Sequence, residues 1–483
     1  MSKELTEEAR ISEYARAVDA SLLIHQEDAR WEAWVDEAAV GRNAHEAGRD
    51  KAWPVLHFDD VSAIPFLQDI SGVEFYQLRA RLRATDGDLF AATCPAVIGY
   101  EAYNQAYLGL GSPSFVYAES VASASEIALA CQHGSAFELL KDTAARSLGM
   151  TVHPYMGAEP AWKLTKAIAE ASGQPVRCVG PRPAVCAYAN HKGHVSRAAE
   201  ALLDDGILGG AALVDSLYGR DPESLTKALR ELAARHARVA LKMTRCASAM
   251  GNGLFESSEL IAESFSDTQA RVSAFLKAKE WMRGDEVIAM AWEDAWSSPS
   301  TQLWLPDPKE GGPLVEGVYE QLLVGPEQVF LGALPSRLGA TWDERLSLAS
   351  LRIARLYQHL GYRGRCSFDF IIAGESAFLV ECNGRWGGTS TPMHLVERVA
   401  SREGTRYRAR DVVSEALVGV AFNEVVEALS GELYDRRSGQ GTYMLYNVGC
   451  LAEHGKLDVV AVGRDDAEIA DALDERLPKL LGL

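Results

Sequence analysis

The sequence lacks the excess of basic residues, the long apolar runs and the export signal that mark several large classes of protein. Its 483 residues include 48 Lys and Arg against 67 Asp and Glu, which gives a formal net charge of −19. A surface this acidic repels DNA and RNA, so we expect no nucleic-acid partner. No apolar run is long enough to cross a bilayer, so we expect no membrane insertion. The first residues are polar and acidic, unlike a secretory signal peptide, and we expect a cytoplasmic protein.

Cysteine pairs and dinucleotide motifs are also missing. The eight cysteines are scattered, and none forms the C-x-x-C pair that is typical of a zinc site. We expect these cysteines to be reduced and buried, as in cytosolic proteins. No G-x-G-x-x-G follows any apolar run, so the sequence contains no dinucleotide fingerprint.

The chain itself has an ordinary composition and is too long for one core. Hydrophobic residues make up 47% and charged residues 24%, as in soluble globular proteins, and the length predicts two to four domains. Residues 1 to about 50 have a helical pattern, which we interpret as a helical cap on the first domain. From Val55 onward, short apolar runs alternate with amphipathic stretches, which predicts a parallel sheet flanked by helices. Later, Thr341-Trp342-Asp343-Glu344 is a capping box that opens a helix ending near Gly361.

The most informative stretch is residues 366–388. Two apolar strands flank a Gly-Glu-Ser turn, and a hairpin centred on Glu375 would place Asp369 directly opposite Glu381. Asn383 lies two residues beyond Glu381 and therefore on the same face of its strand. We expect Asp369, Glu381 and Asn383 to converge on one patch.

Such a patch has a metal-binding and a purely structural interpretation. Two carboxylates side by side on an apolar hairpin repel each other, and a bound divalent cation removes that cost. An oxygen-only donor set favours Mg²⁺, with Mn²⁺ as the alternative, over zinc. For an isolated D…E-x-N pattern, we would prefer the structural interpretation, in which the two acids lie on an exposed sheet face. The sequence from Arg385 to Gly388 favours a metal site instead, because its glycines let backbone N–H groups approach an anion.

This hairpin resembles the metal-binding strands of the ATP-grasp superfamily, which carry an Asp and, about a dozen residues later, E-x-N with a nearby Arg. Residues 186 to about 400 match the order of parts in that superfamily. The resemblance implies that Asp369, Glu381 and Asn383 bind Mg²⁺ and that Glu381 and Arg385 are catalytic. It also implies a set of residues that bind ATP: Lys192, Lys242, Ser248, Gly251, Gly253, Trp292 and Glu293.

Some of these positions have alternatives. Lys192 and Lys242 could be ordinary surface lysines, but Lys242 interrupts an apolar strand. A buried lysine needs an anionic partner, and a phosphate supplies one. Many ATP-grasp ligases have an Arg two residues before the metal-binding Asp, whereas this sequence has Ser367 there and Arg365 two residues further upstream. Arg385 is therefore our preferred candidate for stabilising the transition state.

In detail, the sequence is similar to the pheganomycin-type peptide ligases of this superfamily, through residues 317–326, residues 361–366 and the tail from residue 441 to residue 462. The resemblance implies an α/β and α+β architecture in consecutive parts. Residues 1–183 would form an N-terminal helical segment plus an α/β pre-ATP-grasp domain. Residues 184–405 would form a two-lobed ATP-grasp domain, with a nucleotide lobe at about 184–285 and a catalytic lobe at about 286–405. Residues 406–483 would form a small C-terminal α+β segment.

The activity implied by the resemblance is that of an ATP-dependent carboxylate–amine ligase. Such an enzyme forms an amide through an acyl phosphate and releases ADP and phosphate. Its partners would be small-molecule carboxylates and amines, namely amino acids or a short peptide. An ATP-grasp enzyme with another acceptor, such as a carboxylase or a thiol ligase, and a nucleotide-binding regulator without catalysis are the alternatives. The sequence identifies neither the substrates nor the oligomeric state, and a homodimer stays open.

Overall fold

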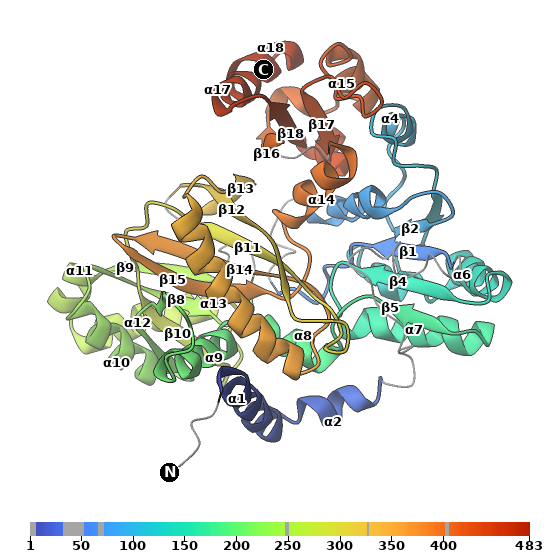
Figure 1. Ribbon diagram of the computed structural model, residues 1–483. Helices are drawn as coiled ribbons and strands as arrows, with labels where there is room; N and C mark the ends of the chain where they lie inside the picture. The colour runs from blue at the N-terminus through green and yellow to red at the C-terminus, as the bar shows by residue number, and fades with distance from the viewer. Residues whose placement is uncertain (1–5, 32–52, 66–71, 247–250, 326–327, 401–404) are drawn as a thin grey trace.

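The computed structural model describes residues 6–31, 53–65, 72–246, 251–325, 328–400 and 405–483. Within these ranges the strands form a parallel sheet, a smaller antiparallel sheet and a large mixed sheet. In Figure 1 the parallel sheet lies at the right, the smaller sheet at the lower left and the C-terminal strands at the top. This arrangement confirms the predicted α/β and α+β organisation.

The parallel sheet lies in the N-terminal part of the chain and has the strand order β3-β2-β1-β4-β5. Its strands are β1 (Val55–Phe58), β2 (Leu89–Ala92), β3 (Ser114–Tyr117), β4 (Met150–Pro154) and β5 (Val176–Cys178). β1, β2, β4 and β5 are buried along their whole length, which explains why the sequence shows continuous apolar runs there. The helical elements around it are η3 (Val73–Arg83, a 3-10 helix), α4 (Tyr100–Ala106), α5 (Ile127–Ala130), α6 (Gly134–Arg146) and α7 (Glu159–Ser172).

The smaller sheet is antiparallel and has the order β7-β10-β8-β9. Its strands are β7 (Ser216–Gly219), β8 (Arg238–Met243), β9 (Asn252–Glu256) and β10 (Val287–Ala291). Its helices, and those that lead into it, are α8 (Pro183–Ala189), α9 (Lys192–Asp204), α10 (Pro222–Ala233), α11 (Ser257–Ala262) and α12 (Phe265–Ala278). Leu225 and Leu229 of α10 are fully buried in one core with Leu241 of β8, so this sheet has its own hydrophobic centre.

The large sheet carries the predicted hairpin and has the order β17-β18-β16-β13-β12-β11-β14-β15-β6. Its strands are β6 (Ala211–Leu213), β11 (Pro299–Leu305), β12 (Leu314–Val324), β13 (Val329–Pro335), β14 (Gly364–Ala373), β15 (Ser376–Asn383), β16 (Arg406–Val413), β17 (Tyr443–Tyr446) and β18 (Lys456–Gly463). Gly332 of β13 pairs with Arg410 of β16. The C-terminal strands therefore extend the sheet of the proposed catalytic lobe, and a domain boundary near residue 406 stays a proposal.

Helix α13 (Ala340–His359) follows β13, and α14 (Ser390–Val399) follows the hairpin. The predicted helix from Thr341 is confirmed, but its capping box is wrong. The helix begins after Gly339 without a side-chain cap, and Asp343 instead accepts a hydrogen bond from Ser336 Oγ at 2.6 Å. The remaining helical elements are η4 (Glu415–Leu417), α15 (Phe422–Ala428), η5 (Val448–Cys450), α16 (Leu451–His454), α17 (Asp466–Asp471), the π-helical turn η6 (Ala472–Arg476) and α18 (Leu477–Leu481).

The N-terminal helices are α1 (Glu7–Leu22) and α2 (Ile24–Ala29). Glu7 pairs with Arg352 of α13 at 2.9 Å, and Ile11 is buried in the core that contains α9 and α13. Further along, Trp31 contacts Trp162 of α7, with ring centroids 6.2 Å apart. The helical cap expected on the first domain is therefore partly wrong, because α1 covers α13 and the chain reaches the first domain at Trp31.

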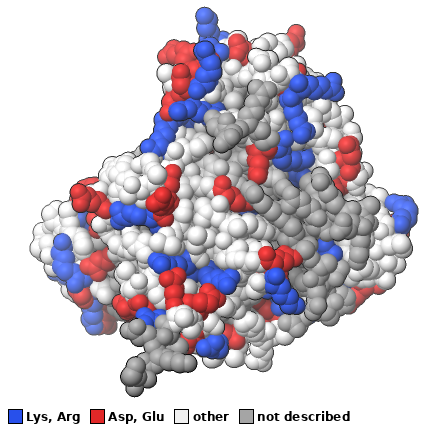
Figure 2. Space-filling view, viewed as in Figure 1, with Lys and Arg blue, Asp and Glu red and all other residues white. Residues whose placement is uncertain are grey.

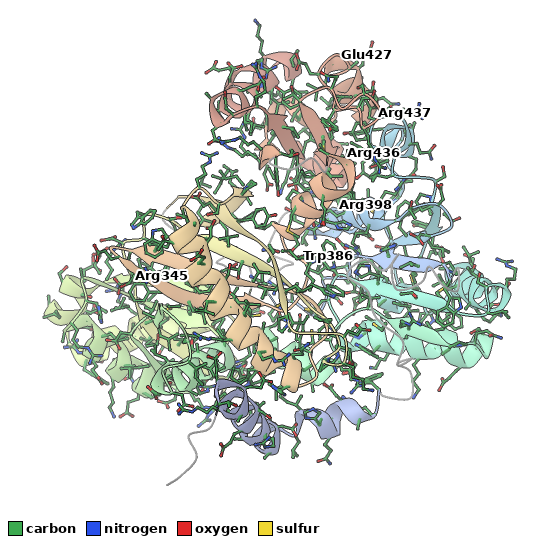
Figure 3. The ribbon with its side chains drawn as sticks, viewed as in Figure 1. Arg345, Trp386, Arg398, Glu427, Arg436 and Arg437 are labelled. Atoms are coloured by element: carbon green, nitrogen blue, oxygen red, sulfur yellow. The ribbon has the colours of Figure 1, made fainter. Side chains whose placement is uncertain are left out.

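Polar contacts tie the C-terminal half to the parallel-sheet domain. Arg398 of α14 donates a hydrogen bond to the carbonyl of Leu82, and Arg436 donates to the carbonyl of Gly109 at 2.8 Å. Figure 3 labels both arginines where the C-terminal part meets the first domain. These contacts place the C-terminal strands beside the first domain, so that both contribute to the cavity described below.

The structure can be compared with what the composition predicts about the cysteines, membrane-spanning helices and surface charge. All eight cysteines are buried and free of disulfide bonds, as predicted. None of the helices in the described ranges combines the length and the hydropathy that a membrane-spanning helix requires. On the face shown in Figure 2, acidic and basic side chains are interspersed rather than gathered by sign.

Candidate active site

The predicted pairing of Asp369 with Glu381 is confirmed, although the hairpin turn differs from the predicted one. The turn spans two residues, because Ala373 pairs with Ser376. Regular pairing from such a turn would place Asp369 opposite Val380. A β-bulge in β15 shifts the register by one residue, so Asp369 instead faces Glu381. The hairpin is therefore not symmetric about its predicted centre, but the two carboxylates meet.

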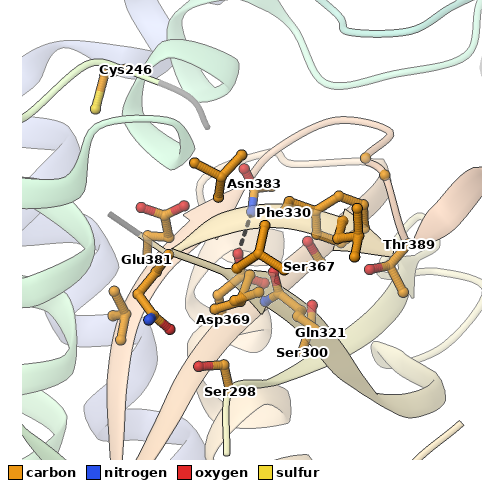
Figure 4. Close-up of a pocket in the computed structure, with 18 of the residues that line it drawn as sticks. Cys246, Ser298, Ser300, Gln321, Phe330, Ser367, Asp369, Glu381, Asn383 and Thr389 are labelled. Atoms are coloured by element: carbon orange, nitrogen blue, oxygen red, sulfur yellow. Dashed lines mark hydrogen bonds between the residues drawn. The ribbon is translucent and has the colours of Figure 1, made fainter. Parts of the chain in front are cut away.

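Asp369 lies at the centre of a half-buried polar patch. Asn383 Nδ2 donates to Asp369 Oδ2 at 2.9 Å, as drawn in Figure 4. On the other side, Ser300 of β11 is the cross-strand neighbour of Asp369. Burial and the negative charge of Glu381 raise the pKa of Asp369 to about 6, against hydrogen bonds from Ser300 and Asn383 that lower it. The predicted triad of Asp369, Glu381 and Asn383 thus shares one patch with two closely spaced carboxylates.

Glu381 lies between the two predicted nucleotide lysines. Lys192 Nζ and Lys242 Nζ are each 3.2 Å from Glu381 Oε2. Burial alone would raise the pKa of Glu381, but the two ammonium groups outweigh it and lower the pKa to about 2. The structure thus brings together three predicted site residues from separate elements, and Glu381 is charged at neutral pH.

Both lysines are buried by the elements that carry them. Lys192 is the first residue of α9, and Lys242 lies on β8 opposite Ile288 of β10. Their exposed fractions are 4% and 9%, which excludes the surface-lysine alternative. Lys192 Nζ also donates to the carbonyl of Cys246 at 2.7 Å. Because a buried ammonium group needs an anionic partner, both lysines depend on Glu381 or on a ligand that replaces it.

Arg385 is held by Asn190, a residue that sequence reasoning missed. Arg385 Nη1 donates to Asn190 Oδ1 at 2.6 Å, and the backbone N–H of Gly384 donates to the same oxygen at 3.0 Å. Asn190 Nδ2 in turn donates to the carbonyl of Cys186 at 2.8 Å. The signal that could have identified Asn190 is its place two residues before Lys192, at the end of α8.

Arg365, the other candidate for the transition-state role, is engaged elsewhere. Its Nη2 lies 3.2 Å from Glu316 Oε1, and both side chains are buried. Its guanidinium carbon lies 4.6 Å from the ring centroid of Trp386. Among the described residues, Arg385 lines the large cavity of the protein and Arg365 does not. The geometry therefore favours Arg385.

That cavity has a volume of about 1060 Å³ and is lined from several elements. Trp292 and Glu293, which the resemblance implies bind ATP, directly follow β10 and form part of its wall together with Met290 of β10. The predicted site residues that line it are Lys192, Lys242, Trp292, Glu293, Asp369, Glu381, Asn383 and Arg385.

The glycine loop between β8 and β9 is described from Gly251 onward, and Ser248 lies outside the described residues. Asn252 lines the cavity, whereas Gly251 and Gly253 are not among its lining residues in the described part of the loop. A Cβ at Gly253 would lie 2.6 Å from the ring of Phe275, so packing alone requires glycine there. A nucleotide contact by either glycine stays a prediction.

The hairpin residues fit a divalent cation by the chemistry of their donors. No group of three His, Cys, Asp or Glu side chains placed to hold a metal occurs in the described ranges, and the candidate set here is two carboxylates and one amide. Burial and the nearby charge of Glu381 raise the pKa of Asp369, and a cation would offset the charge of Glu381. Few protein ligands, all oxygen donors, suit Mg²⁺, which keeps water and phosphate ligands.

Comparisons with known proteins bear on the fold. No protein-family model matches the chain, and no curated protein matches it in sequence. An N5-carboxyaminoimidazole ribonucleotide synthetase in complex with ADP aligns with a TM-score of 0.51 at 12% identity, over 89% of this chain and 99% of that chain. A biotin carboxylase from Campylobacter jejuni aligns with a TM-score of 0.51 at 10% identity, over 87% of this chain and 89% of that chain.

At such identities the likeness carries information about the fold alone. Both solved structures are ATP-grasp proteins, and both align over most of this chain. The polypeptide described here therefore has a multidomain α/β ATP-grasp fold.

Proposed function

We propose that this protein is an ATP-dependent carboxylate–amine ligase that releases ADP and phosphate. One observation carries the proposal. Two buried lysines from different elements share one oxygen of Glu381, which lies opposite Asp369 in the wall of a cavity of about 1060 Å³. Two cations and a carboxylate pair at one place are what a magnesium-bound triphosphate requires.

In the proposed site, ATP phosphate oxygens replace Glu381 as partners of Lys192 and Lys242. Both ammonium groups stay buried, so the exchange keeps each of them paired with an anion. Asp369, Glu381 and Asn383 would hold Mg²⁺, which would neutralise the β- and γ-phosphates. The lysines and the hairpin thus orient the triphosphate together.

The chemistry then needs a carboxylate near the γ-phosphorus. An oxygen of that carboxylate forms a bond to phosphorus while the bond to the leaving ADP oxygen breaks, which gives an acyl phosphate. Arg385, fixed by Asn190, lines the same cavity and stabilises the developing negative charge. An amine then attacks the acyl carbon, loses a proton and expels phosphate, which leaves an amide.

The acceptor is proposed from the sequence resemblance. The similarity to pheganomycin-type peptide ligases supports amino acids or a short peptide as substrates. The matched ATP-grasp structures include a ribonucleotide synthetase with ADP and a biotin carboxylase complex, so carboxylation is the competing outcome. A regulator without catalysis is disfavoured by the presence of both lysines and the complete hairpin set.

The test is ADP release by the full-length protein with Mg-ATP and pools of amino acids, followed by mass spectrometry of the products. The proposal expects ADP release that depends on an amine and a product with the mass of a condensed pair. Bicarbonate in place of the amine tests the carboxylase alternative. Binding of ATP without ADP release under any of these conditions would contradict the ligase assignment.

A further inference from the structure

Trp386 directly follows Arg385, on the segment that connects β15 to α14. It is 5% exposed, and Figure 3 labels it between the large sheet and the first domain. Arg385 and Gly387 line the large cavity, whereas Trp386 is not among the described residues of the cavity wall. Any influence of Trp386 on the reaction must therefore act through its neighbours in the chain.

Two guanidinium groups lie over the ring of Trp386. The guanidinium carbon of Arg83 is 4.8 Å from the ring centroid, and that of Arg365 is 4.6 Å from it. All three side chains are buried. The quadrupole of an indole ring attracts a guanidinium, and most strongly where water is excluded. Arg83 is the last residue of η3 and Arg365 lies on β14, so the ring joins the first domain to the large sheet.

A carboxylate holds each of these two cations. Arg83 Nη1 lies 2.7 Å from Asp59 Oδ1, and Arg365 is paired with Glu316 as described above. Moving either guanidinium away from the ring would break a buried ion pair, which is strongly destabilising. The position of the ring is therefore fixed by charged groups from two parts of the molecule.

The backbone on both sides of Arg385 is held as well. The N–H of Trp386 donates to the carbonyl of Tyr155 at 3.0 Å. The N–H of Gly384 donates to Asn190 Oδ1 at 3.0 Å. Arg385 thus lies between two anchored peptide groups, and the anchor on its C-terminal side belongs to the residue whose ring is held by the two arginines.

We propose that Trp386 is a positioning residue, whose ring, held by Arg83 and Arg365, fixes the backbone that presents Arg385 to the cavity. The inference rests on the proposed ligase function, because it assigns a support to a residue of that reaction. It gives Arg365 a role beside the reaction instead of in it. It also implies that the first domain contributes to turnover through Arg83, which is not among the described residues of the cavity wall.

The first experiment measures ADP release by the full-length protein with Mg-ATP and the amino-acid pools described above. Trp386→Leu should lower kcat by about 10- to 100-fold, because a small displacement of a catalytic group is costly. The KM for ATP should stay unchanged. Trp386→Phe keeps an aromatic face for both guanidinium groups and should retain most of the activity. Trp162→Leu removes a buried tryptophan of α7, outside the described cavity wall, and is the control for lost packing.

A double variant separates positioning from a general loss of structure. In the Arg385→Ala background, Trp386→Leu should cause no further loss of kcat, because a residue that acts through Arg385 has nothing left to position. A tryptophan that only fills the core would lower kcat by the same factor in both backgrounds. Such an additive loss would overturn the proposal.

The second experiment does not depend on turnover. Amide hydrogen exchange, followed by mass spectrometry, is compared between wild type and the variants for peptides that cover residues 384–388. Trp386→Leu should speed exchange there and not in the parallel sheet, whereas Trp386→Phe and Trp162→Leu should leave this segment as in wild type. Unchanged kcat and unchanged exchange in folded Trp386→Leu would overturn the positioning role.

Arg83→Lys is the second variant, and it serves if Trp386→Leu does not fold. Lysine keeps a positive charge for Asp59 but lacks the planar group that stacks on the ring. It should produce the same local increase in exchange and a smaller loss of kcat. Wild-type exchange and wild-type kcat in this variant would overturn the contribution of the first domain.

The two proposals fail in different ways. Faster exchange at residues 384–388 in Trp386→Leu, with no ADP release by wild type under any condition, supports the positioning of this segment and removes the ligase assignment. ADP release by wild type, together with unchanged kcat and exchange in Trp386→Leu, keeps the ligase assignment and removes the role of Trp386.

Discussion

Asp369 lies opposite Glu381 because β15 carries one more residue than β14 between the turn and the pair. The extra residue forms a β-bulge, and bulges often re-aim side chains beside active sites. The bulge turns Glu381 toward a position where Lys192 and Lys242 both reach its Oε2. The hairpin proposed to bind a metal and the lysines proposed to bind phosphate are thereby joined at one atom.

Glu381→Gln should abolish this junction while leaving the hairpin in place. Glutamine keeps the shape but loses the charge that both lysines and a divalent cation need. We expect ADP release to fall by about 10²- to 10³-fold, measured by a coupled assay at saturating ATP. Glu375→Gln, on the exposed turn of the same hairpin, is the control and should behave as wild type. Wild-type turnover by Glu381→Gln would refute the site.

Lys192→Met and Lys242→Met should each weaken ATP binding. Each removes a buried cation that pairs with Glu381 here and with a phosphate in the proposed complex. A lost charge-assisted hydrogen bond corresponds to about 10- to 100-fold in affinity. Equilibrium binding of a fluorescent ATP analogue measures it, with Lys277→Met on the exposed side of α12 for comparison. Unchanged affinity in both variants would assign the lysines a structural role.

Arg385→Ala should lower the rate of ADP release more than the affinity for ATP. Its charge is needed most where negative charge develops, and a loss of about 10²-fold in kcat is expected. Asn190→Ala should reproduce part of this loss, because Asn190 Oδ1 holds both Arg385 and the N–H of Gly384. Steady-state kinetics separates the two effects, and a change confined to the KM for ATP would contradict this role.

The stability of the protein without divalent cations should depend on Asp369. Burial and Glu381 raise its pKa to about 6, from an ordinary value of 3.8. A raised pKa contributes stability that is present below the unfolded value and lost as the pH rises through the folded one. In EDTA, the free energy of unfolding of wild type should therefore fall relative to that of Asp369→Asn as the pH rises from 3.8 to about 6.

Saturating Mg²⁺ should remove this loss, because the cation binds the deprotonated form. Urea titrations at several pH values, with and without Mg²⁺, provide the measurement. Parallel pH profiles for wild type and Asp369→Asn would show that Asp369 has an ordinary pKa.

Gly253→Ala should destabilise the smaller sheet through packing. The added Cβ would lie 2.6 Å from the Phe275 ring, and overpacking of this kind costs about 1–3 kcal/mol. The thermal midpoint should drop, and the double variant with Phe275→Leu should recover most of it. If the double variant regains stability but binds ATP weakly, Gly253 also contributes to the nucleotide site, as the sequence predicts.

Local features of the sequence were sufficient for much of this site. Asp369, Glu381 and Asn383 are close in sequence, and alternation along a strand fixes which side chains share a face. Lys242 stands out because a charge interrupts an apolar strand. The turn was predicted less well, since a two-residue turn with a bulge and a three-residue turn yield the same opposing pair.

The sequence by itself determined the facing pair of the hairpin, the parallel sheet and the burial of the cysteines, because each depends on local residue types. The tertiary structure alone decided that Lys192 and Lys242 meet on Glu381, that Asn190 holds Arg385, and that Arg83 lies over the ring of Trp386. Those contacts join residues that are distant along the chain. Such contacts follow from how the sheets pack, and no local pattern encodes that packing.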